Sequence, residues 1–139
     1  MSSTRNRMDP SIKKQWVSAL RGGHYKQAHG RLRKGNGDCT EGFCCLGVLC
    51  DLASDSGVVN WENIKPLDSH DTPRWACVGS AGYDMSSDQL PKAVMEWSGL
   101  DTNDPQVIGC RGMYDCISHL NDTLGYTFSE LADLIEEQL

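Results

Sequence analysis

The sequence has no long apolar run. No segment of the 139-residue chain approaches the roughly 20 apolar residues of a bilayer-spanning helix, so we expect no membrane contact. The first nine residues are polar and lack the apolar core of a secretory signal, so nothing indicates export. With 39% hydrophobic and 23% charged residues, the chain is apolar enough to fold. We predict a flexible arm over residues 1–8 and a single domain over residues 9–139.

Basic residues become scarce after residue 34. Residues 1–34 contain nine Lys or Arg and one acidic residue. Residues 35–139 contain four Lys or Arg and eighteen acidic residues. This asymmetry indicates either a basic surface for an anion or an acidic body against which the basic segment packs. Domains that bind duplex DNA are usually basic throughout, so an isoelectric point near 5.0 argues against duplex DNA as a partner.

Metal-binding spacings are also missing, although the chain has seven cysteines. Neither the group at positions 39, 44, 45 and 50 nor the pair at 110 and 116 has the C-x2-C pattern of a zinc site. An odd number leaves at least one thiol unpaired, and nothing indicates the exported setting of a disulfide scaffold. We therefore expect reduced cysteines in a cytoplasmic protein, with no metal and no other cofactor.

The first part of the domain is predicted to contain a helix, a strand and a hairpin. Asp9-Pro10 is typical of a helix start and Gly22-Gly23 of a helix end. Residues 25–34 alternate as in a strand, with Leu32 facing the core. The outward face of that strand would carry a basic row of His29, Arg31 and Arg33. Gly35-Asn36-Gly37-Asp38 predicts a turn that leads into residues 40–43.

Residues 43–53 are the most apolar part of the chain. Their length and their Leu, Ala and Cys content favour a buried helix that follows a short strand. A central strand is the alternative, because periodicity does not distinguish the two in a continuous apolar run. Within a helix, Gly47 would indicate a closely packed neighbour, since glycine costs about 1 kcal/mol relative to alanine there.

The remaining sequence predicts short strands and three further helices. Residues 58–61 and 75–79 favour strands, and Leu90-Pro91 favours a helix start. Met113, Ile117 and Leu120 suit a short helix that ends near residues 121–122. The last helix begins with the capping box Thr127-Phe128-Ser129-Glu130. Together these elements give an α+β fold, in which about five helices pack on a small antiparallel sheet.

The last predicted helix has an acidic face formed by Asp133, Glu136 and Glu137. This face is either exposed to solvent or meets the basic first helix of another copy of the chain. The second arrangement leads us to expect a homo-oligomer.

Several motifs resemble a family of small proteins encoded in phage and prophage genomes. They include Trp16, Tyr25-Lys26-Gln27, the block Phe-Cys-Cys-Leu-Gly-Val-Leu-Cys-Asp-Leu at 43–52, and Leu120-Asn121-Asp122. The resemblance extends over about residues 11–139. It implies a phage accessory protein in the cytoplasm of an infected bacterial host, and it carries no catalytic residues to this chain.

A cysteine nucleophile is one candidate chemistry. Cys44 and Cys45 lie where a strand-like segment enters a helix, and a helix N-terminus stabilises a thiolate. His70, with carboxylates beside it in the sequence Asp68-Ser69-His70-Asp71, is the candidate base. No flanking motif of a cysteine hydrolase accompanies these residues, so a cysteine-dependent hydrolase is the third hypothesis.

The leading hypothesis combines aromatic and arginine side chains. Aromatic rings stack on planar ligands, and guanidinium groups donate two parallel hydrogen bonds to phosphate. We therefore predict non-enzymatic binding of a small anionic, phosphorylated molecule, such as a nucleotide immune signal of the host. The alternative is a protein-interaction module that inhibits a host protein. The candidate ligand-binding residues are Tyr25, His29, Arg31, Arg33, Trp61, Arg74, Trp75, Tyr83 and Arg111.

Overall fold

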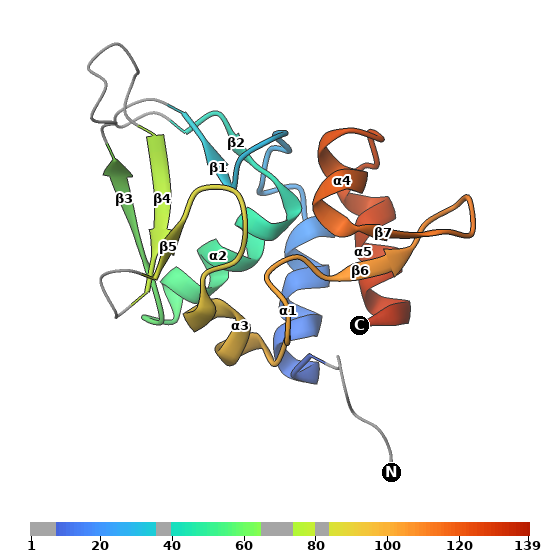
Figure 1. The fold of residues 1–139 in the computed structure, drawn as a ribbon, viewed down its shortest axis with the longest axis horizontal. Helices are drawn as coiled ribbons and strands as arrows, with labels where there is room; N and C mark the ends of the chain where they lie inside the picture. Colours follow the sequence, from blue (N-terminus) through green and yellow to red (C-terminus); the bar gives the residue numbers. More distant parts are fainter. Residues whose placement is uncertain (1–7, 36–39, 65–73, 80–83) are drawn as a thin grey trace.

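A computed structural model describes residues 8–35, 40–64, 74–79 and 84–139 (Figure 1). Within these ranges the chain forms five helices and small antiparallel sheets of two, three and two strands, so the predicted α+β class is confirmed. The helices are α1 (Pro10–Arg21), α2 (Cys45–Asp55), α3 (Lys92–Ser98), α4 (Ile117–Asp122) and α5 (Phe128–Gln138). The strands are β1 (Arg33–Lys34), β2 (Gly42–Phe43), β3 (Asn60–Ile64), β4 (Arg74–Val78), β5 (Met85–Ser86), β6 (Gln106–Ile108) and β7 (Tyr114–Cys116).

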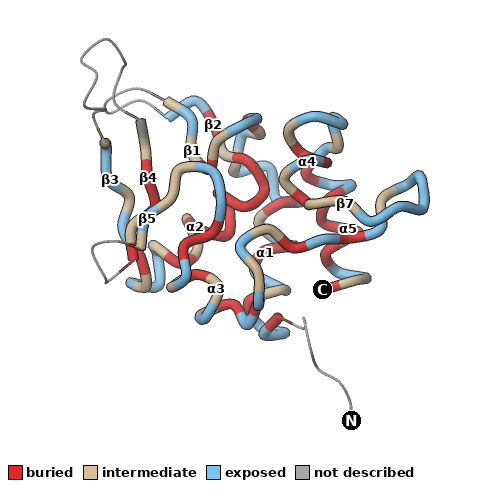
Figure 2. The backbone as a smooth tube through the Cα atoms, viewed as in Figure 1, coloured by how far each residue is buried: buried red, intermediate tan, exposed pale blue. Residues whose placement is uncertain are grey.

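Helix α2 lies at the centre of the molecule, between the sheet β3–β4–β5 on one side and helices α1 and α5 on the other (Figure 1). It begins directly after β2, so the helical interpretation of residues 43–53 is confirmed and the central strand is excluded. Seven of its residues are buried, and Figure 2 shows the buried backbone concentrated around it. A helix that is buried on most sides carries apolar side chains on most sides, which explains the apolar sequence of α2.

Gly47 of α2 packs directly against the backbone of Leu32. A Cβ atom on Gly47 would lie 1.7 Å from the Leu32 carbonyl oxygen, far inside a van der Waals contact. Leu32 is fully buried, and its carbonyl also accepts a hydrogen bond of 3.2 Å from the Cys44 backbone N–H. The predicted close neighbour of Gly47 is therefore the segment that leads into β1.

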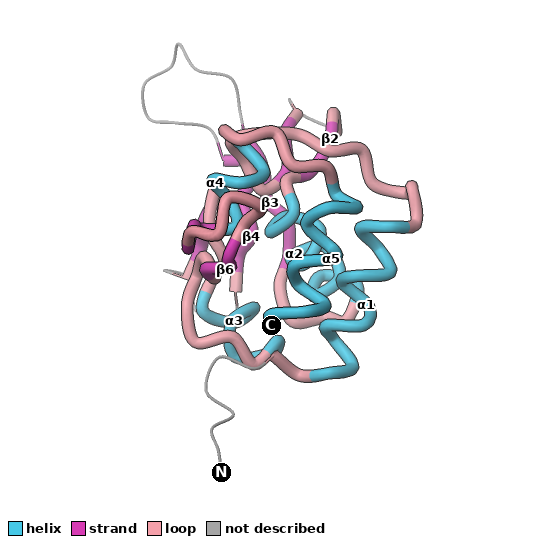
Figure 3. The backbone as a smooth tube through the Cα atoms, turned by 90° about the vertical axis from the view of Figure 1, so that its right-hand side faces the viewer, coloured by secondary structure: helices cyan, strands magenta, loops and turns pink. Residues whose placement is uncertain are grey.

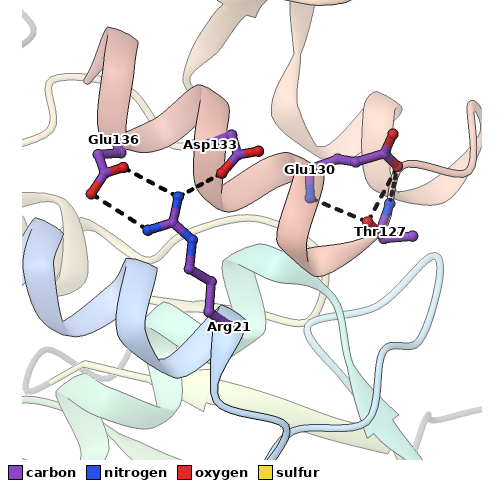
Figure 4. Close-up of polar contacts among 5 residues, drawn as sticks. All are labelled: Arg21, Thr127, Glu130, Asp133 and Glu136. Atoms are coloured by element: carbon purple, nitrogen blue, oxygen red, sulfur yellow. Dashed lines mark hydrogen bonds and ion pairs between the residues drawn. The ribbon is translucent and has the colours of Figure 1, made fainter.

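Helices α1 and α5 pack side by side (Figure 3). The Asp9 carboxylate caps α1, and both parts of the predicted capping box of α5 are present (Figure 4). Arg21 of α1 contacts Asp133 at 2.5 Å and Glu136 at 3.2 Å on α5 (Figure 4). The acidic face of the last helix therefore meets the basic first helix of its own chain, so this charge match no longer argues for a homo-oligomer.

One sequence-based prediction of local structure is wrong, and a second is wrong at one residue. Residues 25–34 do not form one strand, because Gly30 adopts a left-handed φ of 87° and only Arg33–Lys34 pair in β1. His29 and Arg31 therefore do not form a row with Arg33 on one strand face. The predicted short helix with Ile117 and Leu120 is present as α4 and ends at Asp122, but Met113 lies before it in the β6–β7 hairpin, where Gly112 turns the chain with a φ of 76°.

Asn121 of α4 is a buried polar side chain that joins three segments. Its carboxamide oxygen accepts hydrogen bonds from the Cys45 backbone N–H at 3.3 Å and from the Gln27 side chain at 2.8 Å. Its nitrogen donates to the Ala28 carbonyl at 2.9 Å. Because both ends of the amide are satisfied, Asn121 fixes the segment before β1 against the start of α2.

Candidate functional site

Five side chains from separate parts of the chain meet in one place, which we call the aromatic–arginine face: Tyr25, Arg33, Phe43, Trp61 and Trp75. The antiparallel β1–β2 pairing puts Arg33 opposite Phe43. In the β3–β4 register Trp75 pairs with Asn63, so Trp61, two residues before Asn63, points to the same side of the sheet. Figure 1 shows β1 and β2 beside this sheet, which brings the two pairs of strands together.

The Arg33 guanidinium is surrounded by aromatic rings. Its carbon atom lies 3.6 Å from the centre of the Trp75 ring, 5.4 Å from that of Trp61 and 5.7 Å from that of Phe43. All three distances are within the roughly 6 Å range of cation–π attraction. Phe43 also contacts Tyr25 and Trp61 edge to face, with ring centres 5.2 Å and 6.0 Å apart. These contacts hold the guanidinium plane in a defined place.

Asp51 on α2 holds two of the rings in position. One of its carboxylate oxygens accepts a hydrogen bond of 2.6 Å from the Tyr25 hydroxyl, and the other accepts one of 3.0 Å from the Trp61 indole N–H. Burial, and then the Asp51 carboxylate, raise the pKa of Tyr25 well above its ordinary value of 10.0, so the phenol stays protonated and continues to donate. The two rings are therefore tied to the central helix.

Arg33 keeps hydrogen-bonding capacity for a ligand. Its Nε and Nη2 atoms donate to the Thr40 hydroxyl at 2.9 and 2.7 Å, which leaves three of the five N–H groups of a guanidinium. Burial lowers the pKa of Arg33 from 12.5, and Asp51 partly offsets this, so the group remains charged at neutral pH. Among the described residues, the ion pairs involve Arg21 and His119, and none joins Arg33 to a carboxylate.

Three other candidate ligand residues, whose side chains the structure describes, do not join this face. His29 is exposed and Arg31 is half-buried in the bend before β1. Arg111 is exposed in the β6–β7 hairpin, on the opposite side of the molecule from β3 and β4 (Figure 1). The Arg74 side chain lies outside the described part of the structure, as does Tyr83.

Three side chains of the candidate site were not predicted from the sequence: Thr40, Phe43 and Asp51. For Asp51 a signal was present, because it is the one charged residue in the apolar segment 43–53. A charge inside such a segment needs polar partners, and here the partners are the two aromatic donors. Thr40 and Phe43 have no comparable signal, because their contacts arise from strand pairing.

The two candidate nucleophiles are not activated. Cys44 caps α2, and its sulfur accepts a hydrogen bond of 3.4 Å from the Gly47 backbone N–H. Burial nevertheless raises the pKa of the Cys44 thiol to about 12, and burial likewise raises the pKa of Cys45 well above 9.0. The expected stabilisation of a thiolate by the helix N-terminus is therefore outweighed by desolvation. His70, the proposed base, lies outside the described residues.

A cavity of about 690 Å³ lies elsewhere, between the loop at residues 100–105, the β6–β7 hairpin and the end of α5. None of the residues that line it belongs to the aromatic–arginine face. Within the described ranges, no group of three or more His, Cys, Asp or Glu side chains is placed to hold a metal ion. None of the helices in those ranges is long and apolar enough to cross a membrane.

A family model described as "Domain of unknown function (DUF8296)" matches residues 8–139, so the chain belongs to this family. No curated protein and no solved structure matches the chain. The family description assigns no activity.

Proposed function

We propose that this member of the DUF8296 family binds a small, planar, phosphorylated molecule such as a nucleotide on the aromatic–arginine face, without changing it chemically. One observation carries the proposal. The Arg33 guanidinium lies 3.6 Å from the Trp75 ring centre, has no carboxylate partner among the described residues, and retains three N–H groups. A cation that is held in place and forms no ion pair with a carboxylate of the described residues suits a negatively charged ligand.

The chemistry of the face favours a ligand with both a ring and a phosphate. A guanidinium donates two parallel hydrogen bonds to phosphate oxygens, and base–aromatic stacking contributes about 1–3 kcal/mol. Asp51 accepts hydrogen bonds from two of the aromatic residues and offsets part of the Arg33 charge, so phosphate alone would be held weakly. We therefore expect nucleotides to bind more tightly than inorganic phosphate.

The biological setting is part of the same proposal. The sequence block at residues 43–52 resembles phage-encoded proteins, and sequestration of a nucleotide signal in the cytoplasm of an infected bacterium would need only binding. The buried thiols support binding rather than turnover, because the pKa of Cys44 and of Cys45 is raised and neither supplies a thiolate at neutral pH.

The test is a thermal-shift screen with adenosine and guanosine nucleotides, cyclic dinucleotides and inorganic phosphate. A ligand that binds the folded state raises Tm by mass action. We expect Arg33→Gln to abolish the shift and Arg33→Lys to weaken it, since lysine keeps the charge but lacks the planar fork. Arg111→Gln, an equal charge change on the distant hairpin, is the control. An unchanged shift in Arg33→Gln, or none with any compound in the native protein, would contradict the proposal.

A second candidate function, protein interaction, is favoured by the β6–β7 hairpin. Its side chains include exposed apolar groups, with Tyr114 70%, Met113 69% and Ile108 39% accessible. Neighbouring exposed apolar side chains of this kind often mark protein-binding surfaces. A pull-down from bacterial lysate should capture a partner protein. The double variant Met113→Ser with Tyr114→Ser should no longer capture this partner, whereas Arg33→Gln should still capture it. If Arg33→Gln loses the partner and the hairpin double variant still captures it, the hairpin is not the protein-binding surface.

A further inference from the structure

The cavity beside the β6–β7 hairpin has a wall unlike the aromatic–arginine face. Its volume of about 690 Å³ falls within the roughly 300–1,000 Å³ typical of small-molecule sites. None of the described residues that line it is Lys, Arg or His, so the wall offers no cation to a phosphate or carboxylate ligand. An anionic ligand of the kind proposed for Arg33 is therefore not expected in this cavity.

The two acidic side chains of the wall already have partners within the protein. The oxygens of Asp104 accept hydrogen bonds from the Ser118 backbone N–H and hydroxyl, at 3.2 and 2.5 Å. Asp101 likewise has an interaction of its own. Because both carboxylates are engaged, the wall does not present the free negative charges that would select a cation. The ligand that fits this wall is therefore uncharged.

The loop at residues 100–105 forms one side of the cavity and is attached to two other elements. The Asn103 carbonyl accepts a hydrogen bond of 3.1 Å from the Leu90 backbone N–H, before α3. The Pro105 carbonyl accepts one of 2.9 Å from the Ile117 backbone N–H, at the start of α4. A wall fixed in this way is preorganised, which reduces the ordering entropy that a ligand has to offset on binding.

The opposite side of the cavity is one face of the β6–β7 hairpin. Gln106 pairs with Cys116, and Ile108 pairs with Tyr114. Since side chains alternate along a strand, Gln106, Cys116 and Tyr114 share one face, and all three line the cavity. Tyr114 is 70% accessible, and its ring contacts no other aromatic ring among the described residues. The face of this ring is therefore open to a ligand.

The amide side chains of the wall offer uncharged hydrogen-bond acceptors. Asn103 donates its N–H to the Gln89 carboxamide oxygen at 3.0 Å, and Gln106 directs its nitrogen to the Cys116 sulfur at 4.0 Å. The carboxamide oxygens of Asn103 and Gln106 accept no hydrogen bond from the described residues, so both can accept one from a ligand. Buried apolar side chains complete the wall: Leu100, Pro105 and Leu139.

We propose that this cavity binds a neutral sugar of one or two pyranose rings, at a second site that is independent of the aromatic–arginine face. A pyranose carries hydroxyl groups around its edge and C–H groups on its faces. The hydroxyls donate to the amide oxygens of Asn103 and Gln106. The C–H groups pack on the electron-rich face of the Tyr114 ring. A neutral sugar needs no charged partner, which the wall does not supply.

The experiment is an NMR titration of the full chain, in which the backbone amide and indole N–H signals are followed. The neutral probes are glucose, maltose, cellobiose and diacetylchitobiose, and glucuronate is the anionic counterpart of glucose. We expect the neutral disaccharides to shift the amide signals of residues 100–106 and of Tyr114. The Arg33 amide and the indole signals of Trp61 and Trp75 should not move. Glucuronate should shift the cavity signals less than glucose does at the same concentration.

Substitutions in the wall separate stacking from hydrogen bonding. Tyr114→Ser should weaken disaccharide binding by about tenfold, which corresponds to about 1.4 kcal/mol, whereas Tyr114→Phe keeps the ring and should bind nearly as the native protein does. Gln106→Leu removes one acceptor and should also weaken binding. The matched controls are Met113→Ser, an exposed apolar neighbour, and Gln15→Leu, an exposed glutamine of α1. Neither residue lines the cavity, so both variants should bind as the native protein does.

Three results would overturn the site. They are no shift with any of the sugars, equal shifts with glucose and glucuronate, and native affinity in Tyr114→Ser. Shifts at Trp61 and Trp75 in place of the cavity signals would put the sugar on the aromatic–arginine face and would also refute it. Arg33→Gln should leave sugar binding unchanged, so a failure of this site is distinguished from a failure of the proposed nucleotide site.

Discussion

Gly47→Ala is the substitution for which helix propensity and packing predict opposite signs. Alanine in a helix is favoured over glycine by about 1 kcal/mol, so propensity alone predicts a more stable protein. The structure places the new Cβ 1.7 Å from the Leu32 carbonyl oxygen, which is backbone and cannot rotate away. Overpacking typically costs about 1–3 kcal/mol, and occasionally more. Because this contact is so short, we expect a net loss of about 3 kcal/mol in the free energy of unfolding.

Urea unfolding followed by circular dichroism measures this difference from the shift in midpoint at an unchanged slope. Ser54→Ala in the same helix is the control, because the native side chain there already has a Cβ atom and alanine should be neutral or slightly stabilising. Leu32 directly precedes Arg33, so a displaced segment should also weaken ligand binding on the aromatic–arginine face. A Gly47→Ala protein as stable as the native one would refute the packing argument.

Three further substitutions test separate contacts. Asp51→Asn replaces one of the two acceptor oxygens by a donor, so we expect a loss of about 1–3 kcal/mol and weaker ligand binding, measured by urea unfolding and thermal shift. Asn121→Leu leaves buried backbone groups of Cys45 and Ala28 unpaired, and a loss below about 1 kcal/mol in urea unfolding would contradict the role of this amide. The pKa of Asp104 is raised above its unfolded value of 3.8, so its contribution to stability is present below pH 3.8 and is lost as the pH rises through the folded pKa. As the pH rises from 3.8 through the folded pKa, the native protein should therefore lose stability relative to Asp104→Asn. Urea unfolding at several pH values measures this, and a stability difference between the two proteins that stays constant with pH would count against the burial of this carboxyl.

The helices were predictable because their signals are local. Asp9-Pro10 marks the start of α1 and the Thr127–Glu130 box marks that of α5, and both caps are present. The strand expected over residues 25–34 failed for a local reason as well, because alternation describes side chains and does not reveal the left-handed φ of Gly30. The β6–β7 hairpin was hidden because Met113 and Ile117 also fit a helical spacing.

The candidate site was predictable in composition but not in arrangement. Tyr25, Arg33, Trp61 and Trp75 were selected as residue types that bind nucleotides, and the structure brings these four together. Their meeting depends on the β1–β2 and β3–β4 registers and on the packing between the two pairs of strands, which are contacts between distant segments. Arg111 has the same chemistry but lies on another part of the molecule, so residue type alone does not locate a site.

The charge asymmetry of the sequence allowed two interpretations: the structure contains an instance of basic residues packed against an acidic face, whereas a basic surface for an anion remains a proposal. Arg21 packs against the acidic face of α5, whereas Arg33 lies among aromatic rings without a carboxylate partner in the described structure. The contacts of these two arginines should depend differently on the salt concentration. The exposed Arg21 pairs contribute little to stability, so added salt should change the urea midpoint only slightly. A phosphorylated ligand held by Arg33 should instead bind more weakly as salt rises, and salt-independent binding would mean that stacking alone holds it.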